Sequence, residues 1–493
     1  MRHDADQVIA VRVDNRVDQD VAPLSADFTF FGGLYRMVHL VSTEDLHLSL
    51  TDFGSSAVYL QTSNVSASSA ELQVTAKVVN DGPAPRRPTL ETTVIDASGR
   101  EVSQLHSDLE LTGGSEADLI QATTIPNPHL WDGLTDPYLY QARLRVLDNG
   151  RTTDEITKPL GFRSFSVDAS SGFWLNAHPY RLYGVNKHQD RLDVGWAVTD
   201  ANLDQDWSLV KEIGATAVRL AHYQHAQHTY DLADQGGQII WAELPIINRI
   251  TDSTAFAGNA RQQLKELIRQ NFNHPSIAFW SISNEATLSR GPDPRPLLTS
   301  LNDLVHYEDP TRLSTHASAG ESPDVNTDVF GSNRYFGWYY GSYDDVGPWA
   351  DRTHAAHPEW RIGTSEYGAG SSVLANFHSD TPRKQDPPVS VAGNARGGCE
   401  CRRSYRVERL RPLLRPGYVD PGRLNGAAQV GQKTANGWPE DDQSSDCKHS
   451  HKGDDQSVLY KSLSALAPHV VAHPHDVIHA PRMQPRISRS ADW

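Results

Sequence analysis

Residues 276–286 read SIAFWSISNEA, an apolar, β-favouring run that ends abruptly in Asn284-Glu285. An uninterrupted apolar run of this length indicates a strand that is buried on both faces, as in a parallel sheet. A carboxylate directly after such a strand lies at the edge of the core, where apolar surroundings raise its pKa and stiff backbone fixes its direction. Most Glu side chains are simply exposed, but the sequence marks Glu285 as a candidate general acid or base.

The length and composition of the chain exclude several classes of protein. The 493 residues predict two to four domains, and the net charge of −16 argues against a nucleic-acid or basic membrane-surface partner. No apolar run is long enough to span a membrane, and residues 1–15 lack the apolar region of a signal peptide. Cys399, Cys401 and Cys447 all lie in the last quarter, so the body has no predicted disulfide framework. A cytoplasmic and an exported location both stay open.

From about residue 180, apolar strands alternate with amphipathic helices. The predicted strands are 180–185, 216–220, 238–242, 277–282, 312–315, 329–332 and 361–364. The predicted helices are 201–214, 227–235, 261–272, 295–307 and 349–357. Such β/α units in series indicate a parallel sheet and favour a (β/α)8 TIM barrel. No eighth strand is readable after Asp380, so we expect the barrel to be incomplete.

The region before the barrel reads as β structure. Short alternating runs at 8–13, 35–40, 57–60, 71–79, 92–95 and 138–146 are separated by turn-forming residues. The segment 44–165 suits one complete β-sandwich, whereas 1–43 is too short for another. Beyond residue 380 the composition shifts to Pro, Arg and Cys, which predicts a disordered tail. A basic interaction tail and translation out of frame are the alternative interpretations of that tail.

Polar residues gather at the carboxyl ends of the predicted barrel strands. They are Asn186 and His188, His222 and Tyr223, Glu243, Asn284 and Glu285, His316, Tyr335, and Glu366 and Tyr367, in strand order. In a parallel barrel all of these ends meet at one rim, where barrel enzymes hold their active sites. A random scatter of His, Glu and Tyr would not favour strand ends, so the pattern indicates catalysis.

Two of these residues, Glu285 and Glu366, match the needs of glycoside hydrolysis. A retaining glycosidase uses two carboxyl groups about 5 Å apart, one as nucleophile and one as acid/base. We expect Tyr335 to donate a hydrogen bond to the nucleophile and Asn284 to bond a sugar hydroxyl. Trp338 is one of several aromatic residues near the rim that suit stacking on a sugar face. A catalytic zinc ranks low because no HExxH or similar spacing occurs.

Several segments resemble glycoside hydrolase family 2, the group of β-galactosidases and β-glucuronidases. They are SADFTFFGGLYR (25–36), NPHLWDGLTDPYLY (127–140), GFRSF (161–165), YGVNKHQD (183–190), AVRLAHY (217–223), NHPSIAFWSISNE (273–285), NRYFGWYYG (333–341) and TSEYGAG (364–370). The resemblance implies a multidomain β plus α/β protein. Its parts would be a jelly-roll remnant (1–43), an immunoglobulin-like β-sandwich (44–165), a TIM barrel (166–380) and an aberrant tail (381–493).

The resemblance also implies roles for individual residues. Glu285 corresponds to the acid/base and Glu366 to the nucleophile of a covalent glycosyl-enzyme mechanism. The predicted substrate-binding residues are Asp27, His188, His222, Glu243, Asn284, His316, Tyr335 and Trp338. We expect no resident cofactor, because magnesium-dependent members carry Glu and His at positions that hold Ile246 and Asn248 here.

The predicted function is exo-acting, retaining hydrolysis of terminal β-D-galactosides. Galactose is preferred because the stretch after Glu366 shows no Asn-x-Lys signal of the kind by which β-glucuronidases bind a carboxylate. A β-glucuronidase, another family 2 glycosidase and a catalytically dead carbohydrate-binding relative are the alternatives. The expected partner is a carbohydrate, without nucleic acid or membrane, and a homo-oligomer stays open.

Overall fold

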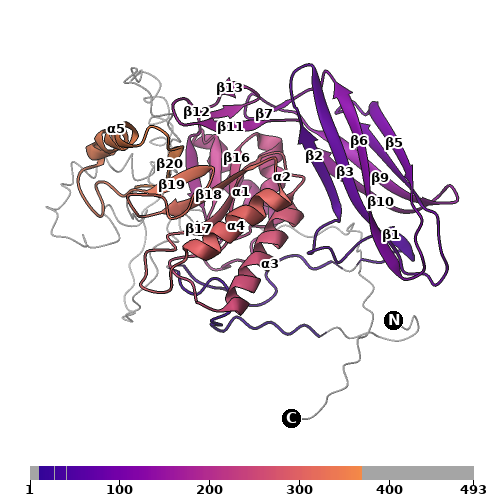
Figure 1. Ribbon diagram of the computed structural model, residues 1–493, viewed down its shortest axis with the longest axis horizontal. Coiled ribbons are helices and arrows are strands. Elements are labelled where there is room, and N and C mark those ends of the chain that lie inside the picture. Colours follow the sequence, from indigo (N-terminus) through magenta and orange to yellow (C-terminus); the bar gives the residue numbers. More distant parts are fainter. Residues whose placement is uncertain (1–9, 27, 40, 369–493) are drawn as a thin grey trace, which may run out of the picture.

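The computed structural model describes residues 10–26, 28–39 and 41–368, which form a β-sandwich packed beside a curved parallel sheet with helices on its outside (Figure 1). Asp27 and everything from residue 369 onward lie outside the described residues. The predictions about an eighth strand, the cysteines and the tail therefore concern parts of the chain that are not described.

Two antiparallel sheets form the sandwich, as predicted for this part of the chain. One contains β1 (Leu46–Leu48), β3 (Ser69–Asn80), β2 (Val58–Ser63) and β6 (Ser115–Pro126). The other has the order β10 (Arg151–Leu160), β9 (Tyr140–Asp148), β4 (Thr89–Ile95) and β5 (Glu101–Asp108). Along β3 every second residue is buried, because one face packs on the core and the other faces water. Two small sheets follow the chain towards the barrel: β7 (Trp131–Asp132) with β8 (Asp136–Pro137), and β11 (Phe165–Asp168), β12 (Gly172–Leu175) and β13 (His178–Pro179).

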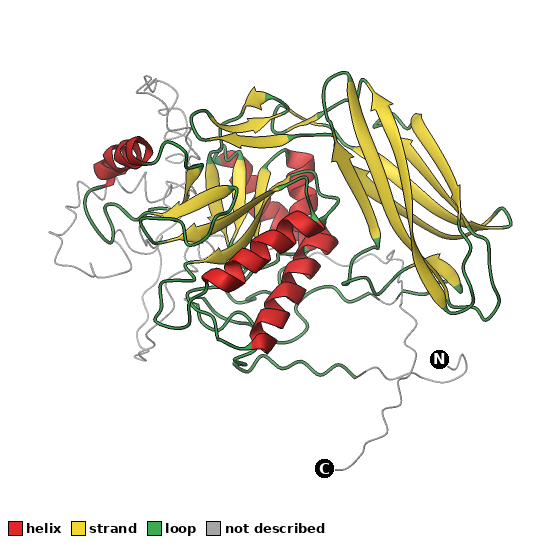
Figure 2. Ribbon diagram, viewed as in Figure 1, coloured by secondary structure: helices red, strands yellow, loops and turns green. Residues whose placement is uncertain are grey.

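Seven parallel strands in chain order form the barrel sheet (Figure 2). They are β14 (Gly184–Lys187), β15 (Ala217–Leu220), β16 (Ile239–Glu243), β17 (Ile277–Asn284), β18 (Leu313–Ser318), β19 (Val329–Asn333) and β20 (Ile362–Glu366). The helices are α1 (Asp200–Glu212), α2 (Gln227–Gly236), α3 (Thr254–Asn271), α4 (Arg295–Glu308) and α5 (Val346–Ala356), the last preceded by the short 3-10 helix η1 (Tyr343–Asp345). All eight residues of β17 are buried, which confirms the prediction from residues 276–286.

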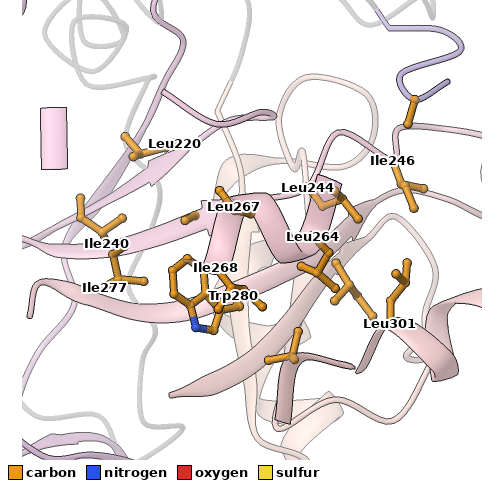
Figure 3. Close-up of a cluster of buried hydrophobic side chains, with 14 of the residues drawn as sticks. Leu220, Ile240, Leu244, Ile246, Leu264, Leu267, Ile268, Ile277, Trp280 and Leu301 are labelled. Atoms are coloured by element: carbon orange, nitrogen blue, oxygen red, sulfur yellow. The ribbon is translucent and has the colours of Figure 1, made fainter. Parts of the chain in front are cut away.

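Apolar faces of the helices pack on the outside of this sheet. Leu264, Leu267 and Ile268 of α3 face Trp280 of β17, and Leu301 of α4 joins them (Figure 3). The sequence analysis began α3 at residue 261, seven residues too late. The Ser253 hydroxyl caps the helix by accepting hydrogen bonds from the backbone N–H groups of Ala255 and Phe256, so the first turn is helical as well.

The connection between β18 and β19 contains no helix. Residues 319–328 cross from one strand to the next as a loop, where a parallel pair normally needs a longer crossover. Hydrogen bonds inside the loop replace the helix: Ser318 Oγ donates to Asp324 Oδ1 at 3.0 Å, and Arg334 donates to the carbonyl groups of Ala319 and Gly320. This loop shapes one side of the rim, the end of the barrel at which its strands terminate.

The predicted strands at 8–13 and 35–40 are wrong for their described residues, because 10–13 and 35–39 form no strand. Alternation of apolar residues makes a strand only where a partner completes the backbone hydrogen bonds. Instead, the described residues between 10 and 45, here called the N-terminal segment, run along the barrel (Figure 1). Ala22 and Leu24 enter the barrel's hydrophobic core, and Arg36 donates to the carbonyl of Gln224 at 2.6 Å.

Within the described chain, β14 and β20 are the outer strands of the barrel sheet. No backbone ladder joins them, but Asn186 Nδ2 of β14 donates to the carbonyl of Ser365 on β20 at 3.3 Å. The two outer strands therefore approach each other at the rim, and the sheet is nearly closed there.

Candidate active site

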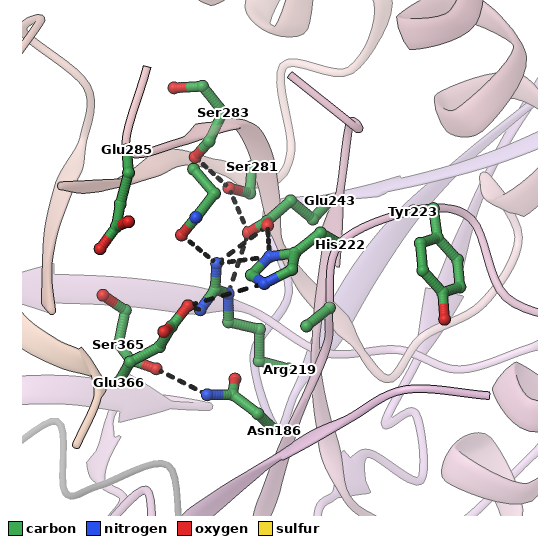
Figure 4. Close-up of polar contacts among 12 residues, drawn as sticks. Asn186, Arg219, His222, Tyr223, Glu243, Ser281, Ser283, Glu285, Ser365 and Glu366 are labelled. Carbon is green, nitrogen blue, oxygen red and sulfur yellow. Dashed lines mark hydrogen bonds and ion pairs between the residues drawn. The ribbon is translucent and has the colours of Figure 1, made fainter. Parts of the chain in front are cut away.

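Arg219, on β15, lies at the centre of a cluster of carboxylates at the rim (Figure 4). Its Nε and Nη2 atoms donate to the two carboxylate oxygens of Glu243 at 2.9 and 2.8 Å. Its Nη1 atom donates to Glu366, and Nη2 also donates to Oδ1 of Asn284 at 2.9 Å. The side chain is only 1% exposed, so these ion pairs form away from bulk water, where charges interact strongly.

Glu243, the last residue of β16, is a fully buried and ionised carboxylate. Besides Arg219, it pairs with Nδ1 of His222 at 2.6 Å and accepts from Trp241 Nε1 at 2.9 Å and Ser281 Oγ at 3.0 Å. Burial alone would raise the pKa of Glu243, but the charges of Arg219 and His222 outweigh it and lower that pKa to about 2. Glu243 therefore holds its neighbours in place and exchanges no proton near neutral pH.

Glu285 follows β17 with a backbone φ of +50°, a left-handed conformation that is uncommon outside glycine. Its backbone N–H donates to the carbonyl of Ala317 at 2.7 Å. The side chain points from the end of β17 towards the side of the rim where Glu366 lies (Figure 4). Burial, and after it the negative charge of Glu366, raise the pKa of Glu285 to about 7. Near neutral pH this carboxyl group is therefore able both to give and to take a proton.

Glu366, the last residue of β20, carries a carboxylate with 14% of its side chain exposed. Arg219 donates to Oε1, and the hydroxyl of Tyr335 donates to Oε2. Burial, followed by the charges of Glu366 and Glu285, raises the pKa of Tyr335 well above its usual value of 10, so Tyr335 remains a hydrogen-bond donor. Donors on both oxygens orient this carboxylate towards the same space that Glu285 faces.

Two histidines line the wall next to Glu366. His222 has Nδ1 on Glu243 and Nε2 at 3.8 Å from Oε1 of Glu366. The His188 ring lies 5.4 Å from the His222 ring, centre to centre. Burial, and next the charge of His222, lower the pKa of His188 well below its usual value of 6.5, so His188 is neutral at neutral pH.

Phe28 brings the N-terminal segment to this wall. Its ring stacks on His222 with the centres 6.0 Å apart, and it lies 5.0 Å from His188 and 5.3 Å from Tyr223. The neighbouring Asp27, predicted to contact the sugar, lies outside the described residues. The position of Phe28 shows that this part of the chain reaches the rim.

Two predicted substrate-binding residues, Trp338 and His316, lie outside the hydrogen-bond cluster around Arg219. Trp338 stacks on Tyr339 with the ring centres 4.2 Å apart and meets Tyr335 edge to face at 5.5 Å. It therefore lies beside the tyrosine whose hydroxyl donates to Glu366. His316 is buried within β18, with Nδ1 on Thr327 Oγ1 at 2.8 Å and Nε2 accepting from the backbone of Asp324 at 3.1 Å. Both ring nitrogens of His316 therefore organise the β18–β19 loop and do not face the two glutamates.

The sequence analysis did not select three residues that the structure brings to the site: Arg219, Asn333 and Phe28. Arg219 left a signal, because a charged residue inside the four-residue strand AVRL is costly to bury without a partner. Asn333, the last residue of β19, donates to Oε1 of Glu285 at 2.8 Å. The sequence does not indicate a role for Phe28, except that it follows the predicted substrate-binding residue Asp27.

One group of described residues has the composition of a metal site, but it lies at the opposite end of the barrel. Asp231 and Asp234 belong to α2, and His274 precedes β17. Asp234 already pairs with His274 Nδ1 at 2.6 Å and accepts from the hydroxyl of Ser276 at 2.5 Å, so these two of the three candidate ligands are engaged in hydrogen bonds. The absence of a cofactor at the rim stays a prediction.

None of the described helices is both long and apolar enough to cross a membrane.

The cluster combines two carboxyl groups of different character over one space. Glu366 has hydrogen-bond donors on both oxygens, whereas Glu285 is half-buried and has a pKa raised to about 7. A carboxylate held by two hydrogen-bond donors, next to a carboxyl group with a raised pKa, suits a reaction that needs one nucleophile or base and one acid.

Comparison with known proteins identifies the same two parts of the chain. Residues 166–381 match the description "Glycosyl hydrolases family 2, TIM barrel domain", and residues 56–163 match "Glycosyl hydrolases family 2". The first match contains both Glu285 and Glu366, and the second covers the sandwich except for β1.

Individual relatives carry two different names. A β-glucuronidase of Bacteroides fragilis is 39% identical over 76% of this chain and 54% of its own length. A β-galactosidase of Bacteroides ovatus is 32% identical over 58% of this chain and 33% of its own length. The solved structure of Bacteroides uniformis β-glucuronidase 2 covalently bound to cyclophellitol-6-carboxylate aziridine is 32% identical, with a TM-score of 0.69 over 73% of this chain and 45% of that one. This chain spans about half the length of the curated relatives it matches, or less.

Proposed function

Because this chain belongs to glycoside hydrolase family 2, we propose that it is a retaining β-glycosidase in which Glu366 is the nucleophile and Glu285 the acid/base. The observation that carries the proposal is the pair of carboxyl groups at the ends of β17 and β20. One lies between two hydrogen-bond donors, and the other is half-buried with a raised pKa. A solved relative that is covalently bound to its ligand supports a covalent route.

In the first step, a carboxylate oxygen of Glu366 attacks the anomeric carbon of the sugar. The bond from that carbon to the leaving oxygen breaks, and Glu285 gives its proton to that oxygen. Arg219 and Tyr335 hold Glu366 in the attacking orientation. The products are a glycosyl ester on Glu366, a free alcohol and an ionised Glu285.

In the second step, Glu285 acts as a base. Esterification removes the negative charge of Glu366, which is one cause of the raised pKa of Glu285, so that pKa falls when a base is needed. The Glu285 carboxylate takes a proton from water while the water oxygen attacks the anomeric carbon and the ester bond to Glu366 breaks. Two inversions give a product with retained configuration.

For the sugar, we propose a terminal β-D-glucuronide first, because the 39% identical relative carries that name. A β-D-galactoside is the second candidate, as the sequence analysis favoured. Two described cations at the rim support this second candidate, because Arg219 is paired with Glu243 and Glu366, and Lys187 with Asp206 at 2.9 Å. A neutral galactoside needs no additional cation, whereas the carboxylate of a glucuronide does.

Nitrophenyl β-D-glucuronide and nitrophenyl β-D-galactoside, assayed side by side, test both proposals. We expect release of nitrophenol from one of them, with the first-formed free sugar in the β configuration by proton NMR. Glu366→Gln is expected to abolish release, and Asp344→Asn, an exposed carboxylate change in η1, serves as the matched control. Inertness of the folded protein towards both substrates, with sugar binding retained, would favour the non-catalytic carbohydrate-binding alternative.

A further inference from the structure

A chain of hydrogen bonds links the strand of Glu366 to the side chain of Glu285. Asn186 Nδ2 of β14 donates to the backbone carbonyl of Ser365, the residue before Glu366 on β20. The hydroxyl of Ser365 donates to Oδ1 of Asn333 on β19 at 2.6 Å. Asn333 Nδ2 then donates to Oε1 of Glu285 at 2.8 Å.

The hydrogen bond from Ser365 holds the Asn333 amide in one of its two orientations. A side-chain amide has an oxygen that accepts and a nitrogen that donates, and either end fits the same space. Here the Ser365 hydroxyl donates to Oδ1, and Nδ2 faces the acceptors Glu285 Oε1 and Asn284 Oδ1, the latter at 3.3 Å. Ser365 and Asn333 are 1% and 2% exposed, so water does not compete for these bonds.

We propose that Ser365 is a positioning residue that acts through Asn333 to aim an N–H donor at Glu285 and so to orient this acid/base and favour its ionised form. The consequence for turnover rests on the proposed function, whereas the hydrogen-bond relay itself does not. With this relay, the strand that carries the nucleophile also positions the other carboxyl group.

The other charged or titratable groups that face Glu285 come from three elements. Glu366 of β20 opposes its ionisation, and His222 after β15 and Arg219 on β15 favour it. Tyr335, after β19, lies close enough for its own pKa to respond to the charge of Glu285. Among the described residues, Asn333 is the group that donates a side-chain hydrogen bond to the Glu285 carboxylate. Its removal should therefore raise the pKa of Glu285.

Difference infrared spectroscopy of the full chain tests the relay without requiring turnover. The carbonyl band of a protonated buried carboxyl group is followed during a pH titration and assigned to Glu285 by its loss in Glu285→Gln. We expect Ser365→Ala to move the midpoint upward by about one pH unit, the size of a hydrogen bond to a charged group. Ser365→Thr keeps the hydroxyl and should restore the original midpoint.

A double-mutant cycle asks whether Ser365 acts through Asn333. Asn333→Ala should raise the midpoint at least as far as Ser365→Ala, and the double variant should equal Asn333→Ala alone. Ser332→Ala is the matched control, because Ser332 is a fully buried serine next to Asn333 whose hydroxyl has no partner among the described residues. Its midpoint should stay that of the original protein.

Two results would overturn the inference: an unchanged midpoint in folded Ser365→Ala, or additive shifts in the double variant. If Ser365→Ala fails to fold, Asn333→Ala and Ser365→Thr still decide, because a midpoint that Asn333→Ala leaves unmoved removes the relay. A shifted midpoint in Ser365→Ala, in a protein that hydrolyses neither nitrophenyl glycoside, would support the relay and contradict the proposed function. Turnover by the original protein with an unchanged midpoint in Ser365→Ala would support the proposed function and contradict the relay.

Discussion

Arg219 and Arg269 each bridge two carboxylates, but they lie in regions with different charge balance. Arg269 of α3 joins barrel and sandwich by pairing with Asp52 at 3.0 Å and with Glu308 at 2.7 Å. Its side chain is 24% exposed, whereas that of Arg219 is 1% exposed. The same ion-pair chemistry therefore operates in a half-solvated interface in one case and in a dry site in the other.

The second difference is the supply of cations. At the interface each carboxylate contacts a further cation, Lys77 for Asp52 and Lys265 for Glu308, at 3.7 and 3.6 Å. At the rim, Arg219 pairs with Glu243 and Glu366, and no described Arg or Lys forms an ion pair with the third carboxylate, Glu285. Matched charges stabilise the contact between the two domains, whereas the half-buried Glu285, without an Arg or Lys partner among the described residues, has a pKa near neutral pH.

The largest expected effect comes from removing the nucleophile. Glu366→Gln should lower kcat/KM by about 10^4-fold or more, because loss of a nucleophile that acts with other groups removes most of the catalysis. The measurement is hydrolysis of the preferred nitrophenyl glycoside, with circular dichroism to establish folding. A loss below about tenfold would assign the nucleophile to another residue.

Removing the central arginine should affect both activity and stability. Arg219→Met leaves the fully buried Glu243 without its main partner, so the free energy of unfolding should fall by about 3–5 kcal/mol. Urea unfolding measures this change. Activity should fall by about 10^2 to 10^3-fold as Glu366 loses a donor. A stability within 1 kcal/mol of the original, roughly the range of an exposed pair, would contradict a buried pair at the rim.

The raised pKa of Glu285 predicts an alkaline limb in the pH profile. Because Glu285 must be protonated to act as an acid, kcat/KM should fall above its pKa of about 7, by about tenfold per pH unit. Glu285→Gln, measured with a good leaving group that needs no acid, should lack this limb. A limb of unchanged position in the variant would assign it to another group.

The same shift should appear in the pH dependence of stability. The pKa of Glu285 is about 7 in the folded chain and 4.5 for an ordinary Glu, so between these values the folded protein binds more protons. The free energy of unfolding should therefore decrease as pH rises through this range and level off above about 7. Urea unfolding of the original protein, compared with Glu285→Gln, isolates the contribution of this residue.

The smallest expected effect belongs to the interface arginine. In Arg269→Met, Asp52 still has Lys77 nearby and Glu308 still has Lys265. The free energy of unfolding should therefore fall by only about 1 kcal/mol. Activity should stay within about twofold, because Arg269 lies outside the site. A loss as large as that of Arg219→Met would show that the two regions do not differ as their exposure indicates.

Predictions made from neighbours in sequence succeeded more often than those that needed distant partners. The buried strand β17 was readable because its apolar run and its terminal Asn284 and Glu285 are contiguous. The strand predicted at 35–40 did not form in its described part, because alternation does not reveal whether a pairing strand is present. His316 was identified as a strand-end histidine, but a sequence does not show that its ring turns into the β18–β19 loop.

The sequence by itself determined the β-sandwich, the parallel barrel sheet and the placing of acids at strand ends, because hydrophobic period and strand termination are local properties of the chain. Only the tertiary structure decided which acids receive a cation. Arg219 is 24 residues from Glu243 and 147 from Glu366, and such pairs meet through the curvature of the sheet. Burial makes this pairing decide the protonation state, because a carboxylate shielded from water either pairs with a cation or keeps its proton.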